Sequence, residues 1–517
     1  MFVGAPPCGC PWAGTGAYPY QTGTEAGATE ETGATEEYRQ NAGATKEYPA
    51  GRGEAGAAKA GFAALDTAPY ELKSASFGEV PMGHMASKDV YARLAHKMDN
   101  LHVRAPWNDA FHAILKELVS SDEAELIVRM PFLLSNLDRV AKVARMSPDQ
   151  LKPILDGLCE KGFVMDIRLG GEYRYMPNPM FVGFFEFTMM RTRGDLNVQV
   201  WSELFHEYMS EGAPYRANFA SDMKVSIARA LPHEESIGDH VEVLDYEKAA
   251  HLIEEAGSYG IGNCSCRHKK EHAEGERCDV PLETCTTLGH GADYLVSHGM
   301  SRKIDKAEAL DVFARSKELG LVFCADNVQT GPMFVCHCCG CCCGIMDGVN
   351  VHGLTNCLVT STLIAEVDEA ECNGCNMCVK ACPVQAIELQ ARPEGGNGET
   401  KKKLASVDRS FCIGCGVCGL KCPTGAVKLV KRTQRVIHPE NTFERVILQC
   451  LERGTLQNQL FDDPLSLTHR VMRPLVGGFL RLDSVKKALM SDMLRSRFLN
   501  AMASGITLLG KGYVREV

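Results

Sequence analysis

The amino-acid sequence predicts a multidomain α+β protein with a cysteine-rich centre between two mostly helical regions. The composition changes near residue 85, where a tract rich in Gly, Ala, Thr and Glu gives way to segments with helical periodicity. Of the 24 cysteines in 517 residues, twenty fall between Cys264 and Cys422. Helical periodicity returns from residue 431 onward, where Cys450 is the one cysteine. A chain of this length has room for several domains of roughly 100–200 residues each.

Residues 1–84 have the composition of a low-complexity tail. They repeat GATEE, GATEEY and GATKEY, beginning at residues 27, 33 and 43. Such a tract cannot bury enough apolar surface to offset the entropy lost on ordering, so we expect it to be disordered. Two other origins stay open: upstream sequence from a misassigned start, because Met85 opens a plausible N-terminus, and a vector-derived junction at GHMAS.

Residues 85–185 are predicted to form three helices followed by a hairpin. Asn108 is suited to cap a helix through AFHAILKELV, and NLDRVAKVARM predicts a second helix. Ser147, followed by proline, suits the start of a third. Two short strands around Gly170-Gly171 predict the hairpin. This order of elements resembles a winged helix.

The charge of this region disfavours the DNA binding that a winged helix suggests. From Arg104 to Arg174 there are ten basic and eleven acidic residues. The third helix offers Lys152 and Lys161 among three acidic side chains. A helix that enters the major groove needs basic flanks for phosphate contact, so we favour a packing or docking module.

Residues 186–365 are predicted to form a cysteine-rich α/β domain. The segment HVEVLDYEKAAHLIEEAGSYGIGNCSCR predicts a short strand, an amphipathic helix and a β-like segment that ends at two cysteines. The later segment DKAEALDVFARSKELGLVFCADN repeats the helix, the glycine and the apolar strand, and another Cys-x-Cys pair follows. We interpret the two as a weak α/β quasi-repeat.

Residues 366–430 contain two cysteine motifs of identical spacing. CNGCNMCVKACP begins at Cys372 and CIGCGVCGLKCP begins at Cys412. Both resemble the bacterial two-cluster ferredoxin motif, in which the fourth cysteine of each run ligates the other 4Fe-4S cluster. A pair of zinc knuckles is the alternative. It is disfavoured because a zinc site needs only four ligands, whereas the sequence has two complete four-cysteine runs, each closed by a proline. The resemblance implies that one cluster is held by Cys372, Cys375, Cys378 and Cys422, and the other by Cys412, Cys415, Cys418 and Cys382.

Four earlier cysteines could form a further site of the same kind: Cys264, Cys266, Cys278 and Cys285. Basic residues directly follow the first pair, from Arg267 to Lys270. Positive charge beside a cluster stabilises its reduced, more anionic form. A structural zinc site is the alternative.

The stretch FVCHCCGCCCGIM has six cysteines in eight residues, more thiols than one cubane takes. If the segment is extended, Cys336 and Cys338 face one way while Cys339, Cys341 and Cys343 face the other. One cluster bound by four of the six is the simplest interpretation. The surplus would serve a second cluster with Cys324 or Cys357, or would hold an unusual, higher-nuclearity or substrate-accessible cluster. Zinc or another thiophilic metal is the alternative. The metal-site candidates in this run are Cys336, Cys338, Cys339, Cys341, Cys342 and Cys343.

Residues 431–517 are predicted to form a helical tail that covers the cluster domains. KKALMSDMLRSRFLNAMASGITLLGKG could alternatively lie on a membrane surface. No run of eighteen apolar residues occurs, which disfavours a membrane-spanning helix. The net charge of −10 gives no reason to expect nucleic acid or an anionic membrane as a partner. Clustered thiols without a recognisable export signal suit the reducing cytoplasm.

The order of NCSCRHKK, ETC, ADN, CHCCGCCCG and the two ferredoxin motifs resembles a family of multi-cluster 4Fe-4S proteins from anaerobic microbes. Members of that family carry a winged-helix-like N-terminal region. The resemblance covers residues 85–517. It implies electron transfer between redox partners in anaerobic metabolism and brings no particular substrate with it.

We therefore expect an electron-transfer protein with two ferredoxin-type 4Fe-4S clusters and one or two more in the cysteine-rich domain. No dinucleotide fingerprint or P-loop is found in the sequence, so a flavin or nicotinamide would sit on a partner flavoprotein or other oxidoreductase. One alternative is an oxidoreductase subunit with a catalytic cluster or thiol at Cys336–Cys343. The other is a redox-sensing DNA-binding regulator. A carrier or subunit is favoured over a stand-alone enzyme, and the oligomeric state is left open.

Overall fold

The structure is a computed structural model that describes residues 89–516 except 192, 193, 195, 392–402, 434, 435 and 509. The expectation of a disordered tail over residues 1–84 lies outside the described residues. All of the described residues belong to one unit of the chain.

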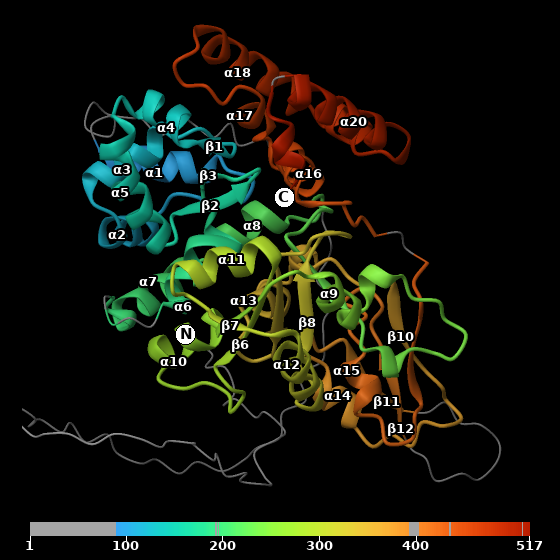
Figure 1. The fold of residues 1–517 in the computed structure, drawn as a ribbon. Coiled ribbons are helices and arrows are strands. Elements are labelled where there is room, and N and C mark those ends of the chain that lie inside the picture. The colour runs from blue at the N-terminus through green and yellow to red at the C-terminus, as the bar shows by residue number, and fades with distance from the viewer. Residues whose placement is uncertain are drawn as a thin grey trace, which may run out of the picture. The chain divides into compact units, whose positions relative to one another are not determined.

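The first region combines five helices with a small antiparallel sheet of strand order β1-β3-β2 (Figure 1). Its elements are α1 Val90–Asp99, α2 Asp109–Leu118, α3 Ser121–Arg129, β1 Ser135–Asn136, α4 Leu137–Ala144, α5 Pro148–Glu160, β2 Val164–Leu169 and β3 Glu172–Pro177.

Sequence-local signals set the boundaries of these elements. The Asn108 side chain accepts a hydrogen bond of 2.7 Å from the backbone N–H of Phe111, which caps α2. Ser147 and Gln150 form a capping box at the start of α5. β2 and β3 pair across Gly170-Gly171, both of which have positive φ. The predicted caps and the predicted hairpin are confirmed.

Three further helices follow and contribute apolar side chains to the interior: α6 Phe185–Met190, α7 Val198–Ser210 and α8 Ala213–Phe219. The segment before α6 is irregular, because Val182 adopts φ 50° between two extended residues.

The centre of the protein is a six-stranded sheet of order β4-β8-β9-β6-β5-β7, in which every neighbouring pair is antiparallel. Its strands are β4 Ala228–Leu231, β5 Tyr259–Asn263, β6 Glu283–Leu288, β7 Arg302–Ile304, β8 Val322–Asp326 and β9 Phe334–Cys338. The accompanying helices are α9 Ala249–Glu255, α10 Ser265–Glu274, α11 Gly289–Ser297, α12 Lys306–Glu318 and α13 Gly344–Asn350. The predicted helices and apolar strands of the quasi-repeat are present, but the short strand predicted at the beginning of HVEVLDY is wrong, since those residues precede a 3-10 turn at Asp245–Glu247.

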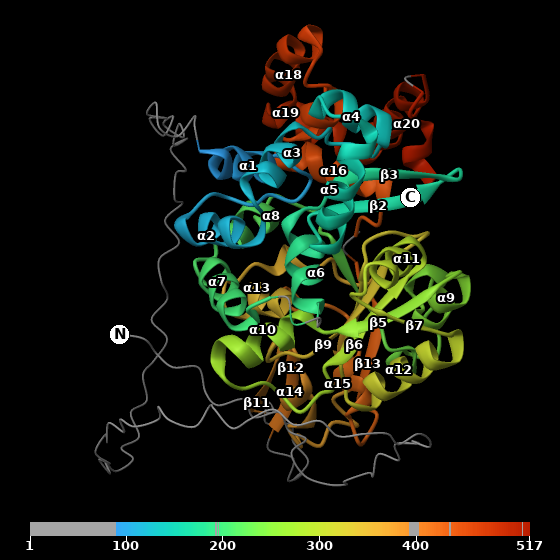
Figure 2. The same ribbon diagram turned by 60° about the vertical axis from the view of Figure 1, so that its left-hand side comes forward.

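The two faces of the sheet have different chemistry, because strand side chains alternate between faces. On one face, Phe323 and Val335 pack with apolar residues of α9 and α12, such as Ile253 and Phe313. On the other face, Cys324 stands directly opposite Cys336 across the β8–β9 pair. Figure 2 shows α9 and α12 on one side of the sheet and α6, α10 and α13 on the other.

The ferredoxin-like region consists of two similar halves. Each half has a two-stranded antiparallel sheet and a short helix: β10 Leu363–Val367 pairs with β13 Val427–Lys431, β11 Ile387–Ala391 pairs with β12 Lys403–Val407, and the helices are α14 Met377–Ala381 and α15 Val417–Leu420. Asp368 and Asp408 occupy equivalent turns, where each carboxylate accepts a 2.8 Å hydrogen bond from the backbone N–H two residues later.

The C-terminal region is helical, as predicted: α16 Thr442–Arg453, α17 Leu456–Leu460, α18 Leu467–Leu480, α19 Asp483–Leu489 and α20 Asp492–Leu508. Helix α16 is mostly buried, whereas α18 exposes an apolar stripe at four-residue spacing that runs from Leu467 to Phe479. Among the described helices, none is both long and apolar enough to span a bilayer.

Candidate metal centres

The first ferredoxin set consists of Cys372, Cys375, Cys378 and Cys422, and its four side chains line one small cavity of about 10 Å³. Cys372 and Cys375 come from the loop that leads into α14, Cys378 lies in the first turn of α14, and Cys422 follows α15. Cys375 is exposed, while Cys372 and Cys378 are buried. The edge of this cavity therefore reaches the protein surface.

The second ferredoxin set consists of Cys382, Cys412, Cys415 and Cys418, and it lines an equivalent cavity of about 20 Å³. Backbone N–H groups point at its sulfurs, since Ala386 N lies 3.2 Å from Cys382 Sγ and Ala365 N lies 3.5 Å from Cys412 Sγ. Hydrogen bonds of this kind to cluster sulfurs tune a reduction potential. The structure thus brings together both quartets as the motif resemblance implied.

The donor sets fit 4Fe-4S clusters in chemistry. Each cavity presents four thiols and apolar walls, which is the ligand complement of a cubane. Burial raises the pKa of Cys378 to about 11 and also raises the pKa of Cys415 well above its usual value. Without metal these thiols would stay protonated at neutral pH, so cluster binding would release protons from them.

A third group of thiols faces one large cavity on the cysteine-bearing side of the central sheet. We call it the central set: Cys264, Cys266, Cys285, Cys336, Cys338 and Cys343. The cavity has a volume of about 110 Å³, and Cys339 and Cys357 also border it. Its opposite wall is apolar and comes from α6, α7 and α8, with Phe185, Met209 and Phe219 among the lining residues.

The central thiols lie in contact with one another. Interaction with Cys343 raises the pKa of Cys266, and interaction with Cys336 raises the pKa of Cys285. The backbone N–H of Gly344, next to Cys343, donates a 3.4 Å hydrogen bond to Cys266 Sγ. Cys324, on the neighbouring strand β8, lies directly opposite Cys336 of β9. This density of thiols exceeds the four ligands that one cubane takes.

Two charged side chains border the same cavity. Burial raises the pKa of Glu186 to about 7, and its carboxylate accepts a 3.1 Å hydrogen bond from the backbone N–H of Gly183. Arg267 is 1% exposed and donates to Thr284 Oγ1 and to the His337 carbonyl, both at 2.6 Å. Burial alone would lower the pKa of Arg267, but nearby thiolates, Cys264 first among them, raise it.

Sequence reasoning did not single out Glu186 as a site residue. A usable signal was present, because this glutamate is the one charged residue in the run FVGFFEFTMM. A carboxyl group inside an apolar run is expected to be buried, and buried acids cluster at functional sites.

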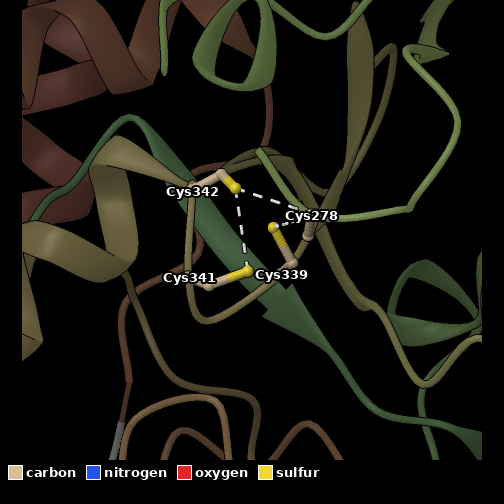
Figure 3. Close-up of side chains that lie close together, drawn as sticks. All are labelled: Cys278, Cys339, Cys341 and Cys342. Carbon is tan, nitrogen blue, oxygen red and sulfur yellow. Dashed lines mark hydrogen bonds between the residues drawn. The ribbon is translucent and has the colours of Figure 1, made fainter. Parts of the chain in front are cut away.

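A fourth group, the loop set, comprises Cys278, Cys339, Cys341 and Cys342 (Figure 3). Their four sulfurs all lie within 4.8 Å of one another. Cys278 comes from the loop between α10 and β6, and the other three come from the turn that follows β9.

The loop set corrects two expectations from the sequence. The predicted quartet of Cys264, Cys266, Cys278 and Cys285 is divided, because Cys278 joins the loop set while the other three face the central cavity. The predicted alternation of the cysteine run also ends early. The chain turns at 340–342 and enters α13 at Gly344, so Cys343 returns to the side of Cys338.

The second ferredoxin set lies next to the loop set and the central sheet. An ideal Cβ on Gly340 would lie 2.8 Å from the Pro383 carbonyl oxygen, so the backbone at Gly340 is in contact with the backbone at Pro383. Gly340 directly follows Cys339, and Pro383 directly follows Cys382. Asn350 of α13 donates a 3.0 Å hydrogen bond to the same carbonyl. His233 N donates to the Cys415 carbonyl at 2.9 Å. The second ferredoxin set therefore adjoins the loop set and the central sheet.

Comparison with known families supports the assignment of one of these regions. Residues 371–426 match the 4Fe-4S dicluster domain family, so the chain contains an iron–sulfur domain that supports at least one 4Fe-4S cluster. The match covers both ferredoxin motifs and none of the central or loop cysteines. No curated protein matches the chain, and no solved structure does.

Proposed function

We propose that the protein is an iron–sulfur electron-transfer protein that relays electrons between redox partners. In this proposal each ferredoxin set binds one 4Fe-4S cluster, and the central set binds one or two more. The observation that carries the proposal is the gathering of two four-cysteine sets around two small cavities inside the matched domain. The reducing cytoplasm is the compartment that suits so many free thiols.

The bound clusters would supply reversible one-electron chemistry at potentials that their surroundings adjust. The chain's own residues bury the sulfurs, direct backbone N–H groups at Cys382 and Cys412, and leave Cys375 exposed. The exposed edge at Cys375 is the natural place for a protein redox partner to approach. A flavoprotein or another oxidoreductase would fit this role.

The central cavity supports at least one additional cubane. Its volume of about 110 Å³ exceeds the volumes of about 10 and 20 Å³ of the two ferredoxin cavities. Its six thiols likewise exceed the four that line each ferredoxin cavity. Six thiols are more than one cubane takes and two fewer than two cubanes take, so the set favours one larger cluster, or two cubanes that also use Cys324 and Cys357.

A second candidate function is supported by the walls of this cavity. Apolar side chains from α6 and α8 stand opposite the thiols, and the Glu186 carboxyl lies beside them. A protonatable group and an apolar wall next to redox-active thiols are what a small-molecule oxidoreductase site requires. An oxidoreductase subunit is therefore the alternative to a pure electron carrier.

A DNA-binding regulator is not proposed, because cations of the first region are engaged within the chain. Arg139 forms a 3.0 Å ion pair with Asp462 of the C-terminal region. Arg174 of the hairpin lies over the ring of Tyr513, with 3.6 Å between the guanidinium carbon and the ring centroid. These contacts occupy two of the side chains that would otherwise meet phosphates.

Iron and sulfide analysis of protein purified without oxygen, combined with electron paramagnetic resonance, tests the proposal. At four irons per cubane, we expect about twelve to sixteen irons per chain with matching sulfide. About eight irons would restrict the clusters to the ferredoxin sets and refute the central ones. Iron-free protein would refute the proposal as a whole.

A pair of variants separates the central iron from the ferredoxin iron. Cys266→Ala should lower the iron content by about four or more while the signals of the ferredoxin clusters persist. Cys450→Ala is the control, since Cys450 is a buried thiol that lies in α16 outside all four thiol groups. An unchanged iron content in Cys266→Ala would contradict a central cluster.

A further inference from the structure

The loop set differs from the other thiol groups in how closely its sulfurs approach. Cys278 Sγ lies 3.7 Å from Cys339 Sγ and 3.7 Å from Cys342 Sγ. Cys341 Sγ lies 3.7 Å from Cys342 Sγ. In Figure 3 the four sulfurs, contributed by two loops, point toward one common centre.

These distances match the edges of a tetrahedron around one metal ion. Zinc binds thiolate sulfur at about 2.3 Å in tetrahedral geometry, which requires sulfur–sulfur edges of about 3.8 Å. All three of the 3.7 Å contacts agree with that edge length. Disulfide bonds are excluded for these pairs, because a bonded S–S distance is about 2.05 Å.

A cubane would need a wider arrangement. Each cysteine of a 4Fe-4S cluster binds a different iron, so the thiolates stand apart on the outside of the iron cage. The ferredoxin sets behave in this way: among the described residues, a group of three or more cysteines within 4.8 Å occurs in the loop set and in neither ferredoxin set. The same chain thus shows two spacings of four thiols.

The surroundings suit a compact anionic site. Four thiolates around one divalent ion carry a net charge of −2, and Arg267 is a buried cation that donates a 2.6 Å hydrogen bond to the His337 carbonyl, two residues before Cys339. Lys270 donates a 3.0 Å hydrogen bond to the Cys341 carbonyl. Arg277 donates a 2.9 Å hydrogen bond to the Cys278 carbonyl. Hydrogen bonds from basic side chains to backbone carbonyls therefore stabilise both loops.

The geometry points to a mononuclear metal site in the loop set: one tetrahedral ion, zinc in the first place, bound by Cys278, Cys339, Cys341 and Cys342. All four positions are filled by protein, so the site is structural, with no open coordination position for a substrate. It cross-links residues 61 to 64 positions apart in the chain. It would thereby hold the turn at Gly340 against Pro383 and fix the border between the central cavity and the second ferredoxin set.

Zinc and iron analysis with X-ray absorption at the zinc edge tests this site on the full-length protein. We expect about one zinc per chain with a single shell of four sulfurs at about 2.3 Å and no iron neighbour. One sulfide-free iron ion in the same shell would equally support a mononuclear site. Zinc-free protein in which every iron is matched by sulfide would overturn it.

Variants add a test that is independent of the iron–sulfur proposal. Cys341 is the one half-buried member of the set, so Cys341→Ser disturbs packing least. It should lose the zinc while keeping the iron and sulfide of the wild type, and Cys450→Ala should keep all three. Loss of sulfide and about four irons with no loss of zinc would overturn the inference. If Cys341→Ser fails to fold, the X-ray absorption spectrum of the wild type decides whether the mononuclear site is present.

Discussion

At the residue scale, two glycines shape the ferredoxin loops. Gly374 and Gly414 stand between the first two cysteines of each motif and have φ of 69° and 67°. A Cβ at Gly374 would lie 2.7 Å from the Lys403 carbonyl oxygen, and one at Gly414 would lie 2.2 Å from that of Leu363. Both the left-handed backbone and the close approach require glycine at these positions.

Gly414→Ala should therefore lose the cluster of the second ferredoxin set. The added methyl group collides with a backbone atom that cannot rotate away. The left-handed φ costs a non-glycine residue a further ~1–2 kcal/mol. The iron content should fall by about four per chain, measured together with the Tm.

Gly425→Ala is the control for this prediction. Gly425 has φ 70°, but no atom lies within 4 Å of its ideal Cβ position. This variant bears the same conformational cost without the collision, so it should keep its iron. Equal iron loss in both variants would show that the conformational cost, and not the close approach, matters.

At the element scale, the alternation along β8 and β9 separates a packing face from a cysteine face. Residues on the packing face stabilise the sheet against α9 and α12, and residues on the other face border the central cavity. The C-terminal helix α16 is tied to this sheet by Arg445, whose Nε lies 3.1 Å from Asp326 Oδ1. Both partners are buried, so this ion pair joins two distant elements in a medium that screens charge poorly.

Arg445→Met should destabilise the protein by about 3 kcal/mol, because it leaves the Asp326 carboxylate buried without its nearest partner. The expected readout is a lower Tm in the cluster-loaded protein. Lys248→Met is the control, since Lys248 and Asp245 form a 2.8 Å ion pair on the surface. An exposed pair contributes little, so the Tm of the control should not change. A Tm of Arg445→Met equal to that of the wild type would show that the pair is not needed to hold α16.

At the scale of the whole molecule, the loop set, the central set and the second ferredoxin set adjoin one another. The contact of Gly340 with Pro383 joins the turn of the loop set to the second ferredoxin set. The central set borders the cavity beside the loop set, and its cysteines come from β6, β9 and the N-terminal ends of α10 and α13. Under the proposed function, this continuity allows electrons that enter at the exposed Cys375 edge to reach the central cavity.

Gly340→Ala should weaken that connection. Its methyl group would lie 2.8 Å from the Pro383 carbonyl oxygen, so the two backbones must separate. We expect the iron content of the wild type but a slower reduction of the central iron after the ferredoxin clusters are reduced. Rapid-mixing spectroscopy measures this rate. Gly257→Ala is the control, because no atom lies within 4 Å of an ideal Cβ on Gly257. Unchanged kinetics in Gly340→Ala would contradict a route through this contact.

The amino-acid sequence by itself determined the features that depend on near neighbours. The caps at Asn108 and Ser147, the hairpin at Gly170-Gly171 and the spacing of the ferredoxin motifs all follow from residues a few positions apart. Local chain geometry controls such features, so a short stretch of sequence is enough to predict them.

Only the tertiary structure decided how the remaining thiols are grouped. Cys278 meets Cys339 across 61 positions of chain, and Cys266 meets Cys343 because α10 and α13 pack on the same face of the sheet. Strand order and the turn at 340–342 set these distances, and neither can be predicted from the spacing of the cysteines. Spacing therefore predicted that metal ligands were present, while long-range packing determined which of them share a site.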